Sequence, residues 1–163
     1  KLFIFPFSIV RKTIIFVLSI YNLMAKKSTL QVKDAVVKTL QQNGIDYICI
    51  TDIARQKNPV EPKDVVKNWM RVKNTLEYLG IWEKLNNPNF KGVEFDPLLA
   101  EAGSNAFTMS PTRWVETTNA IGIITKNGAG GGTYTQRDIA FKFASWVLGK
   151  RKQEYYLLNN RHL

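Results

Sequence analysis

The chain has 163 residues, of which 45% are apolar, and this is enough for one domain with a hydrophobic core. Its 23 Lys and Arg residues outnumber 13 Asp and Glu residues, and the resulting formal charge of +10 indicates an anionic partner, either nucleic acid or an acidic membrane surface. The only cysteine (Cys49) and the only histidine (His162) exclude a disulfide within the chain and argue against a zinc site, which draws three or four ligands mainly from these residue types.

Residues 1–23 differ in composition from the rest, because they contain no acidic residue and consist mostly of Phe, Ile, Leu, Val, Tyr and Lys. Arg11 and Lys12 divide them into two apolar pieces, which is untypical of a signal peptide, and neither piece has the roughly 20 apolar residues of a spanning helix. AT-rich DNA encodes the same mixture, which favours upstream sequence read in frame, with an ordinary start at Met24. We therefore expect a non-native or signal-like segment over 1–23 and a single domain over 24–163.

The stretch "KDAVVKTLQQNGIDYICI" predicts a β-hairpin. Two β-prone runs flank Asn43-Gly44, the favoured dipeptide of a two-residue turn. Cys49 lies in an apolar run, as is typical of a buried thiol. Thr51 is then expected to cap a short helix, "DIARQ". The segment "NPVEP" is typical of a loop, and Pro62 suits the first turn of the helix that follows.

The stretch from Pro62 to Leu85 has strong helical periodicity. Apolar residues recur at steps of 4, 3, 4 and 3 and form one stripe: Val65, Trp69, Val72, Leu76 and Leu79. A basic row recurs at steps of 4 on a different face: Lys63, Lys67 and Arg71. Asn74-Thr75 is suited to cap a second helix, which would divide the region at a tight joint, and Gly80 suits a bend. The basic row is either a solvated face or a nucleic-acid contact.

Further along, "VEFDPLLAEAG" predicts a short helix that ends at Gly103. Ser110 is expected to cap a helix whose first residue is Pro111. Nearer the end of the chain, Thr135 followed by Asp138 is similar to a capping box. The helix beyond carries a core-facing row: Ile139, Phe143, Trp146 and Val147. Four tryptophans are expected to anchor packing: Trp69, Trp82, Trp114 and Trp146.

The segment "GAGGG" raises the question of a nucleotide pocket. A phosphate-binding loop needs a lysine after its last glycine, which is missing, and Thr133 stands where a dinucleotide fingerprint needs its third glycine. Two β-prone runs, Ile121–Thr125 and Thr133–Thr135, instead predict a hairpin with a glycine-rich tip. Because glycine lets main-chain N–H groups come close to a ligand, such a tip is able to lie against a phosphate backbone. A plain flexible loop is the alternative.

Three blocks resemble KilA-N domain proteins of bacteria and phages, and they occur in the family's order: "YICITDIA", "NWMRVKNTLEYLGIWEKLNNPNF" and "WVETTNAIGIITKNGAGGGTYTQRDIAFKFASWV". The resemblance covers residues 46–148. It implies an α+β DNA-binding domain similar to the fungal APSES domain: a compact winged helix-turn-helix-like fold with an N-terminal β-hairpin, several helices and a glycine-rich hairpin wing. The chain departs from the family at Ala129, where a basic residue is common, and in lacking Ser-Pro-Glu-Phe after the "FASW" block.

By this resemblance a helix pair and the wing face DNA. The helix residues expected to contact it are Lys63, Lys67, Asn68, Arg71, Lys73, Asn74 and Thr75, and the wing residues are Lys126, Asn127, Thr133, Gln136 and Arg137. Arg71 or Asn74 is the expected base reader, since Arg pairs well with guanine and Asn with adenine. The lysines would hold phosphates, which makes binding depend on salt.

The expected function is therefore a cytoplasmic DNA-binding module of phage or mobile-element origin, in transcriptional regulation or antirepression. Its partner is double-stranded DNA, with a phage or host regulatory protein as a further partner, and no cofactor or metal is expected. Membrane contact is expected only if residues 1–23 are made. One alternative is a protein-interaction module of an antirepressor, in which DNA contact is secondary. A hydrolase is disfavoured, because acidic pairs such as Glu94 and Asp96 have no catalytic spacing, so no enzyme is expected.

Overall fold

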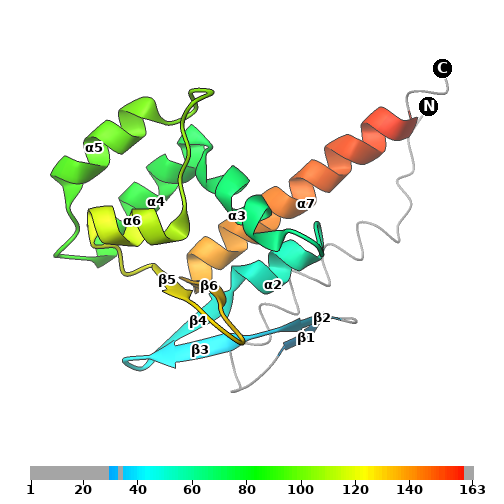
Figure 1. The fold of residues 1–163 in the computed structure, drawn as a ribbon, viewed down its shortest axis with the longest axis horizontal. Coiled ribbons are helices and arrows are strands. Elements are labelled where there is room, and N and C mark those ends of the chain that lie inside the picture. The colour runs from blue at the N-terminus through cyan, green and yellow to red at the C-terminus, as the bar shows by residue number, and fades with distance from the viewer. Residues whose placement is uncertain (1–29, 33–34, 160–163) are drawn as a thin grey trace.

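The computed structural model describes residues 30–32 and 35–159, so the expectation for residues 1–23 lies outside the described part. Within that part the fold is α+β, with six helices and two antiparallel sheets (Figure 1). The helices are α2 (Ile50–Arg55), α3 (Pro62–Met70), α4 (Lys73–Asn86), α5 (Gly92–Glu101), α6 (Pro111–Thr118) and α7 (Arg137–Asn159). Figure 1 shows α4, α5 and α6 grouped together, while α7 runs from the sheet out to the opposite side.

Three pairings of consecutive strands and one long-range pairing make the two sheets. Strands β1 (Leu30–Val32) and β2 (Ala35–Val37) form a small hairpin that was not predicted. The larger sheet has the order β3-β4-β6-β5, and its strands are β3 (Thr39–Gln42), β4 (Ile45–Cys49), β5 (Ile123–Lys126) and β6 (Gly132–Gln136). Strand β6 pairs with both β5 and β4, with Ile48 opposite Thr135. The glycine-rich hairpin is therefore joined edge to edge with the N-terminal hairpin.

The predicted turn at Asn43-Gly44 is confirmed. Gln42 pairs with Ile45 across a two-residue loop, and both turn residues have positive φ, 53° at Asn43 and 78° at Gly44. This backbone geometry matches the right-handed twist of the flanking strands, and Asn and Gly adopt it at the lowest cost.

Some predicted helix starts are confirmed. Pro62 and Pro111 stand in the first turns of α3 and α6, and the Ser110 side chain caps α6 by accepting a hydrogen bond from the Arg113 main-chain N–H at 3.1 Å. The division into α3 and α4 is also confirmed. The cap expected from Asn74-Thr75 is wrong, because both residues lie inside α4 and the residue before it, Val72, makes no side-chain cap.

Two further expected caps, from Thr51 and Thr135, are wrong, because neither residue stands directly before a helix. Helix α2 begins at Ile50, with no side-chain cap, and the Thr51 Oγ1 accepts a hydrogen bond from the Thr133 main-chain N–H at 2.9 Å. Thr135 lies in β6, and its buried hydroxyl has no hydrogen-bond partner among the described residues.

The predicted apolar stripe packs into the core between the helices and the sheet. Its buried members are Val65, Trp69, Leu76 and Leu79, whereas Val72, at the joint of α3 and α4, is 36% exposed. The α7 row also faces the core, and the Trp69 and Phe143 rings meet edge to face with centroids 5.1 Å apart. All four tryptophans pack in or against the core, as predicted. Helix α4 runs through Gly80 without a break, and Phe95 fills the space that a side chain there would need.

Candidate nucleic-acid interface

Helix α3 separates its apolar and polar side chains as the periodicity predicts. Lys63, Lys67 and Asn68 are exposed, while Val65 and Trp69 face the core. The Lys67 ammonium lies 3.7 Å from an Asp64 carboxylate oxygen, and both side chains are more than half exposed. Such a surface pair contributes little to stability, so the exposed row is available to a ligand.

The joint between α3 and α4 presents three more of the predicted residues. Arg71 ends α3, is half-buried and donates a hydrogen bond from Nη2 to the Asn105 carbonyl oxygen at 3.2 Å. Lys73 and Asn74 are exposed in the first turn of α4, and the described residues offer the Asn74 amide no partner. The Thr75 side chain is buried, so its hydroxyl is not presented at the surface.

The glycine-rich segment closes the β5–β6 hairpin, which occupies the place of the wing expected from the resemblance and keeps that name as a label only. Gly128 and Gly130 have φ of 84° and 75°, and the Gly131 N–H donates to the Gly128 carbonyl at 2.9 Å. The Tyr134 hydroxyl donates to the Gly130 carbonyl at 3.1 Å and so ties the tip to strand β6. A side chain on Gly131 would lie 2.6 Å from the Lys126 carbonyl oxygen, which explains the glycine there.

The wing presents most of its predicted residues but not all. Lys126, Asn127 and Arg137 are exposed, and Gln136 is half-buried. Thr133 is buried and donates its main-chain N–H to Thr51, so its side chain does not face a ligand. We leave Thr75 and Thr133 out of the contact set proposed below.

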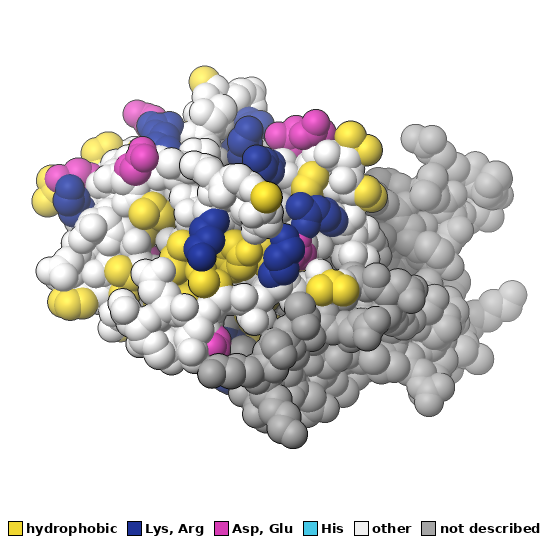
Figure 2. Space-filling model, turned by 60° about the horizontal axis from the view of Figure 1, so that its bottom comes forward, with side chains coloured by type: hydrophobic (Ala, Val, Ile, Leu, Met, Phe, Trp, Pro, Cys, Tyr) yellow, Lys and Arg dark blue, Asp and Glu magenta, His cyan; other side chains and the backbone are white. Residues whose placement is uncertain are grey.

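Helix α2 lies between the two predicted groups. It contacts α3 on one side and β6 on the other, and Figure 1 shows the hairpin below α2 and the α3–α4 pair above it. The predicted residues therefore form two groups rather than one cluster. Figure 2, seen more from the side of the sheet, shows several Lys and Arg side chains around a central apolar patch.

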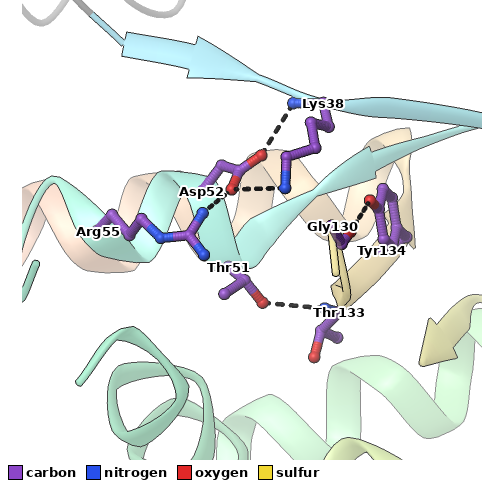
Figure 3. Close-up of polar contacts among 7 residues, drawn as sticks. All are labelled: Lys38, Thr51, Asp52, Arg55, Gly130, Thr133 and Tyr134. Atoms are coloured by element: carbon purple, nitrogen blue, oxygen red, sulfur yellow. Dashed lines mark hydrogen bonds and ion pairs between the residues drawn. The ribbon is translucent and has the colours of Figure 1, made fainter. Parts of the chain in front are cut away.

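Sequence reasoning missed a polar cluster beside the wing, drawn in Figure 3. The carboxylate of Asp52, which is only 4% exposed, accepts a hydrogen bond from the Lys38 main-chain N–H at 3.0 Å and one from the Arg55 guanidinium. The Lys38 ammonium lies 3.8 Å from the same carboxylate. The spacing of Asp52 and Arg55 on one helix was visible in the sequence, whereas the approach of Lys38 depends on the packing of α2 against the strands.

A second buried carboxylate was also missed. Glu83, in the last turns of α4, accepts hydrogen bonds from the main-chain N–H groups of Ile121 and Gly122, the closest at 2.7 Å. The Asn87 amide donates to it at 2.9 Å. Because Ile121 and Gly122 lead directly into β5, Glu83 fixes the start of the wing to the helix pair.

Titratable groups near the wing have raised pKa values. Burial raises the pKa of the Cys49 thiol to about 11, and this side chain is fully buried, as predicted. Burial also raises the pKa of Tyr134, with smaller effects from its charged neighbours. The described residues contain no group of three His, Cys, Asp or Glu side chains placed to hold a metal ion. Among the helices in this part of the chain, none combines the length and apolar character needed to cross a membrane.

Comparison with protein families matches the KilA-N domain over residues 31–159. The match confirms the resemblance and extends beyond residues 46–148 in both directions. KilA-N domains are of a DNA-binding type. Comparisons with curated proteins and with solved structures find no match.

Proposed function

Because the chain belongs to the KilA-N domain family, we propose that it is a DNA-binding module of phage or mobile-element origin. In this proposal it works in the cytoplasm, in transcriptional regulation or antirepression, and has no catalytic role. The α3–α4 pair and the β5–β6 hairpin act as a winged helix-turn-helix on duplex DNA. The observation that carries the proposal is that the basic and amide side chains of α3 and early α4 are exposed while the apolar stripe of the same helices is buried.

The proposed contacts divide into positioning and reading. Lys63, Lys67 and Lys73 on the helices and Lys126 on the wing are exposed cations suited to phosphates, which fix a protein on the duplex without reading its sequence. Asn74 is the better placed of the two expected base readers, because its amide is exposed and has no partner among the described residues. The guanidinium of Arg71 is partly engaged by Asn105.

Salt dependence tests the phosphate contacts. The affinity of the protein for a duplex of random sequence, measured by fluorescence anisotropy, should fall steeply between about 50 and 200 mM salt. Lys63→Gln should reduce the slope of log affinity against log salt by about 1, because one phosphate contact is lost. Lys91→Gln removes the same charge from an exposed lysine outside the proposed surface and should leave the slope unchanged. Absence of DNA binding by the wild-type protein would refute the proposal.

Sequence selection tests the reading role of Asn74. Duplexes enriched from a random pool by the wild-type protein should share a short motif that contains adenine, since an Asn amide pairs with the adenine edge in the major groove. Asn74→Ala should relax the preference at one position of that motif and weaken binding to it by about 1–3 kcal/mol. An unchanged motif in the variant would show that Asn74 does not read a base.

A protein-interaction module is the second candidate function. Ile81 and Leu85 lie one turn apart on α4 and are 60% and 79% exposed. Two such side chains make a small apolar surface, and isolated exposed apolar residues are common in monomeric proteins. The alternative would gain support if the wild-type protein captured a phage or host regulator and Ile81→Ser with Leu85→Ser abolished that capture.

A further inference from the structure

The cluster of Lys38, Asp52 and Arg55 holds two cations on one buried carboxylate (Figure 3). The Asp52 side chain is 4% exposed, whereas those of Lys38 and Arg55 are 37% and 44% exposed. The carboxylate therefore orients two cationic side chains that both still reach solvent. Since one negative charge faces two positive charges, the cluster retains a net positive charge.

Among the described residues, these cations use only a small part of their hydrogen-bonding capacity. A guanidinium has five N–H donors and an ammonium has three. Apart from the contacts with Asp52, the described residues provide no partner for either cationic group. An arginine anchored on one side in this way presents its remaining donors in a fixed direction, and their planar arrangement matches the oxygens of a phosphate.

The cluster lies beside the wing. One residue before Asp52, the Thr51 hydroxyl accepts the main-chain N–H of Thr133 in β6. Strand β4, which leads directly into α2, pairs with β6, with Cys49 opposite Tyr134, and α2 itself contacts β6. The Tyr134 hydroxyl in turn holds the carbonyl of Gly130 at the tip. The cluster is therefore carried by a helix that packs against strand β6 of the glycine-rich hairpin.

Within the wing, the exposed charges lie at Lys126 before the glycine-rich tip and at Arg137 after strand β6. Between Lys126 and Arg137 the hairpin contains no charged residue. Its glycines are able to bring main-chain N–H groups close to an anion, but they supply no full positive charge. Helix α2, which ends at Arg55, lies between the hairpin and the α3–α4 pair and is the element best placed to supply it.

We propose that Lys38 and Arg55, oriented by Asp52, form a binding site for a DNA backbone phosphate on the side of α2 and β6. This inference rests on the proposed function and adds to it a DNA contact that lies between the α3–α4 pair and the wing. The site positions the duplex and reads no base, because ion pairs with phosphate carry no sequence information. A purely structural cluster, which only fastens the strand region to α2, is the alternative that the experiment has to separate.

The experiment measures the salt dependence of binding to duplex DNA for Lys38→Gln, Arg55→Gln and the double variant. Each single variant should make the slope of log affinity against log salt less steep by about 0.9. Between about 50 and 200 mM salt, the affinity of the variant should therefore fall by a factor about 3.5 times smaller than that of the wild-type protein. The double variant should lower the slope by about twice as much. Lys91→Gln, which removes an exposed charge elsewhere, should retain the wild-type slope.

Three outcomes decide the proposal. Reduced slopes with melting temperatures close to that of the wild-type protein support it. Wild-type slopes in Lys38→Gln, Arg55→Gln and the double variant overturn the phosphate site while the proposed function stands. A wild-type protein that does not bind DNA overturns both. If the double variant does not fold, Arg55→Lys carries the test: it should keep the slope and bind more weakly, because the charge remains while the planar donor arrangement is lost.

Discussion

Removing the carboxylate of Glu83 should destabilise the domain, because this side chain accepts the hydrogen bonds that hold the start of strand β5 on α4. Glu83 is fully buried, and its two oxygens accept hydrogen bonds from Ile121, Gly122 and Asn87 at distances between 2.7 and 3.2 Å. Glu83→Ala would take the acceptor from three N–H groups: the main-chain N–H groups of Ile121 and Gly122, and one of the two N–H groups of the Asn87 amide, whose other N–H still donates to Asn119. A buried unsatisfied donor costs about 1–3 kcal/mol, so even the lower figure gives a loss of about 3 kcal/mol.

The conservative change Glu83→Gln should cost less but more than zero. One side-chain oxygen would be replaced by an NH2 group, which has to face either the Asn87 amide or the main-chain N–H groups. The Asn87 amide has no freedom to turn round, because its Oδ1 accepts from Asn89 at 3.0 Å and its Nδ2 also donates to Asn119 at 2.8 Å. The loss of one buried hydrogen bond predicts a cost of about 1–3 kcal/mol.

Thermal unfolding followed by circular dichroism measures these costs. A loss of 1 kcal/mol lowers the melting temperature of a chain of this size by about 2–4 °C, so Glu83→Ala should melt roughly 6–12 °C below the wild-type protein. Glu77→Ala is the matched control, because Glu77 is an exposed residue of the same helix and its removal should change stability by no more than about 0.5 kcal/mol. If Glu83→Ala melted within about 2 °C of the wild-type protein, the reasoning from unsatisfied donors would be refuted.

Three further predictions concern single residues. Gly80→Ala should destabilise the domain by about 1–3 kcal/mol, because the added Cβ would lie 2.3 Å from the Phe95 ring. Gly149→Ala, in open space on α7, should stabilise it by up to about 1 kcal/mol. Urea unfolding compares the two variants, and a stabilised Gly80→Ala would contradict the packing argument. Gly44→Ala should cost about 1–2 kcal/mol of stability, because φ is 78° at this position, where a Cβ strains the backbone. No other atom lies within 4 Å of the added Cβ, so backbone strain alone is tested. An unchanged urea midpoint would be evidence against that strain. At about pH 8 the Cys49 thiol should react slowly with a disulfide reagent in the native protein, because it is buried and its pKa is raised to about 11, so it stays protonated. In urea it should react rapidly. Rapid labelling of the native protein would show that the thiol is accessible.

The predictable part of the fold depends on interactions between residues close together in the chain. The Asn43-Gly44 turn, the Ser110 cap and the stripe through Trp69 each follow from a pattern that spans a few residues, and each is confirmed. Thr51 and Thr135 show the limit of the same reasoning. Both stand at positions suited to a cap. Helix α2, however, begins one residue before Thr51, and Thr135 lies in strand β6, where it pairs with Ile48 of β4.

The candidate site was predictable only in part, for the same reason. The helical period correctly indicated that Lys63 and Lys67 lie away from the core, because side-chain direction on a helix follows from spacing alone. It did not reveal that the Thr75 and Thr133 side chains are buried, since burial of a small polar residue depends on what packs over it. The match to the KilA-N domain confirms the family, whereas the DNA contacts of individual residues remain predictions for the salt and selection experiments.

The helices, the Asn43-Gly44 turn, the glycine-rich turn, the positive charge and the family were all predictable from the amino-acid sequence. Three features depend on the packing of distant segments: β6 lies between β4 and β5, Lys38 contacts Asp52, and Glu83 holds the start of the wing. The physical reason is the range of the interactions. Dihedral preferences, caps and turn geometry act within a few residues. These contacts join residues that are 14 positions apart for Lys38 and Asp52, 39 for Glu83 and Gly122, and 135 − 48 = 87 for Ile48 and Thr135, so they form only when the core brings their elements together.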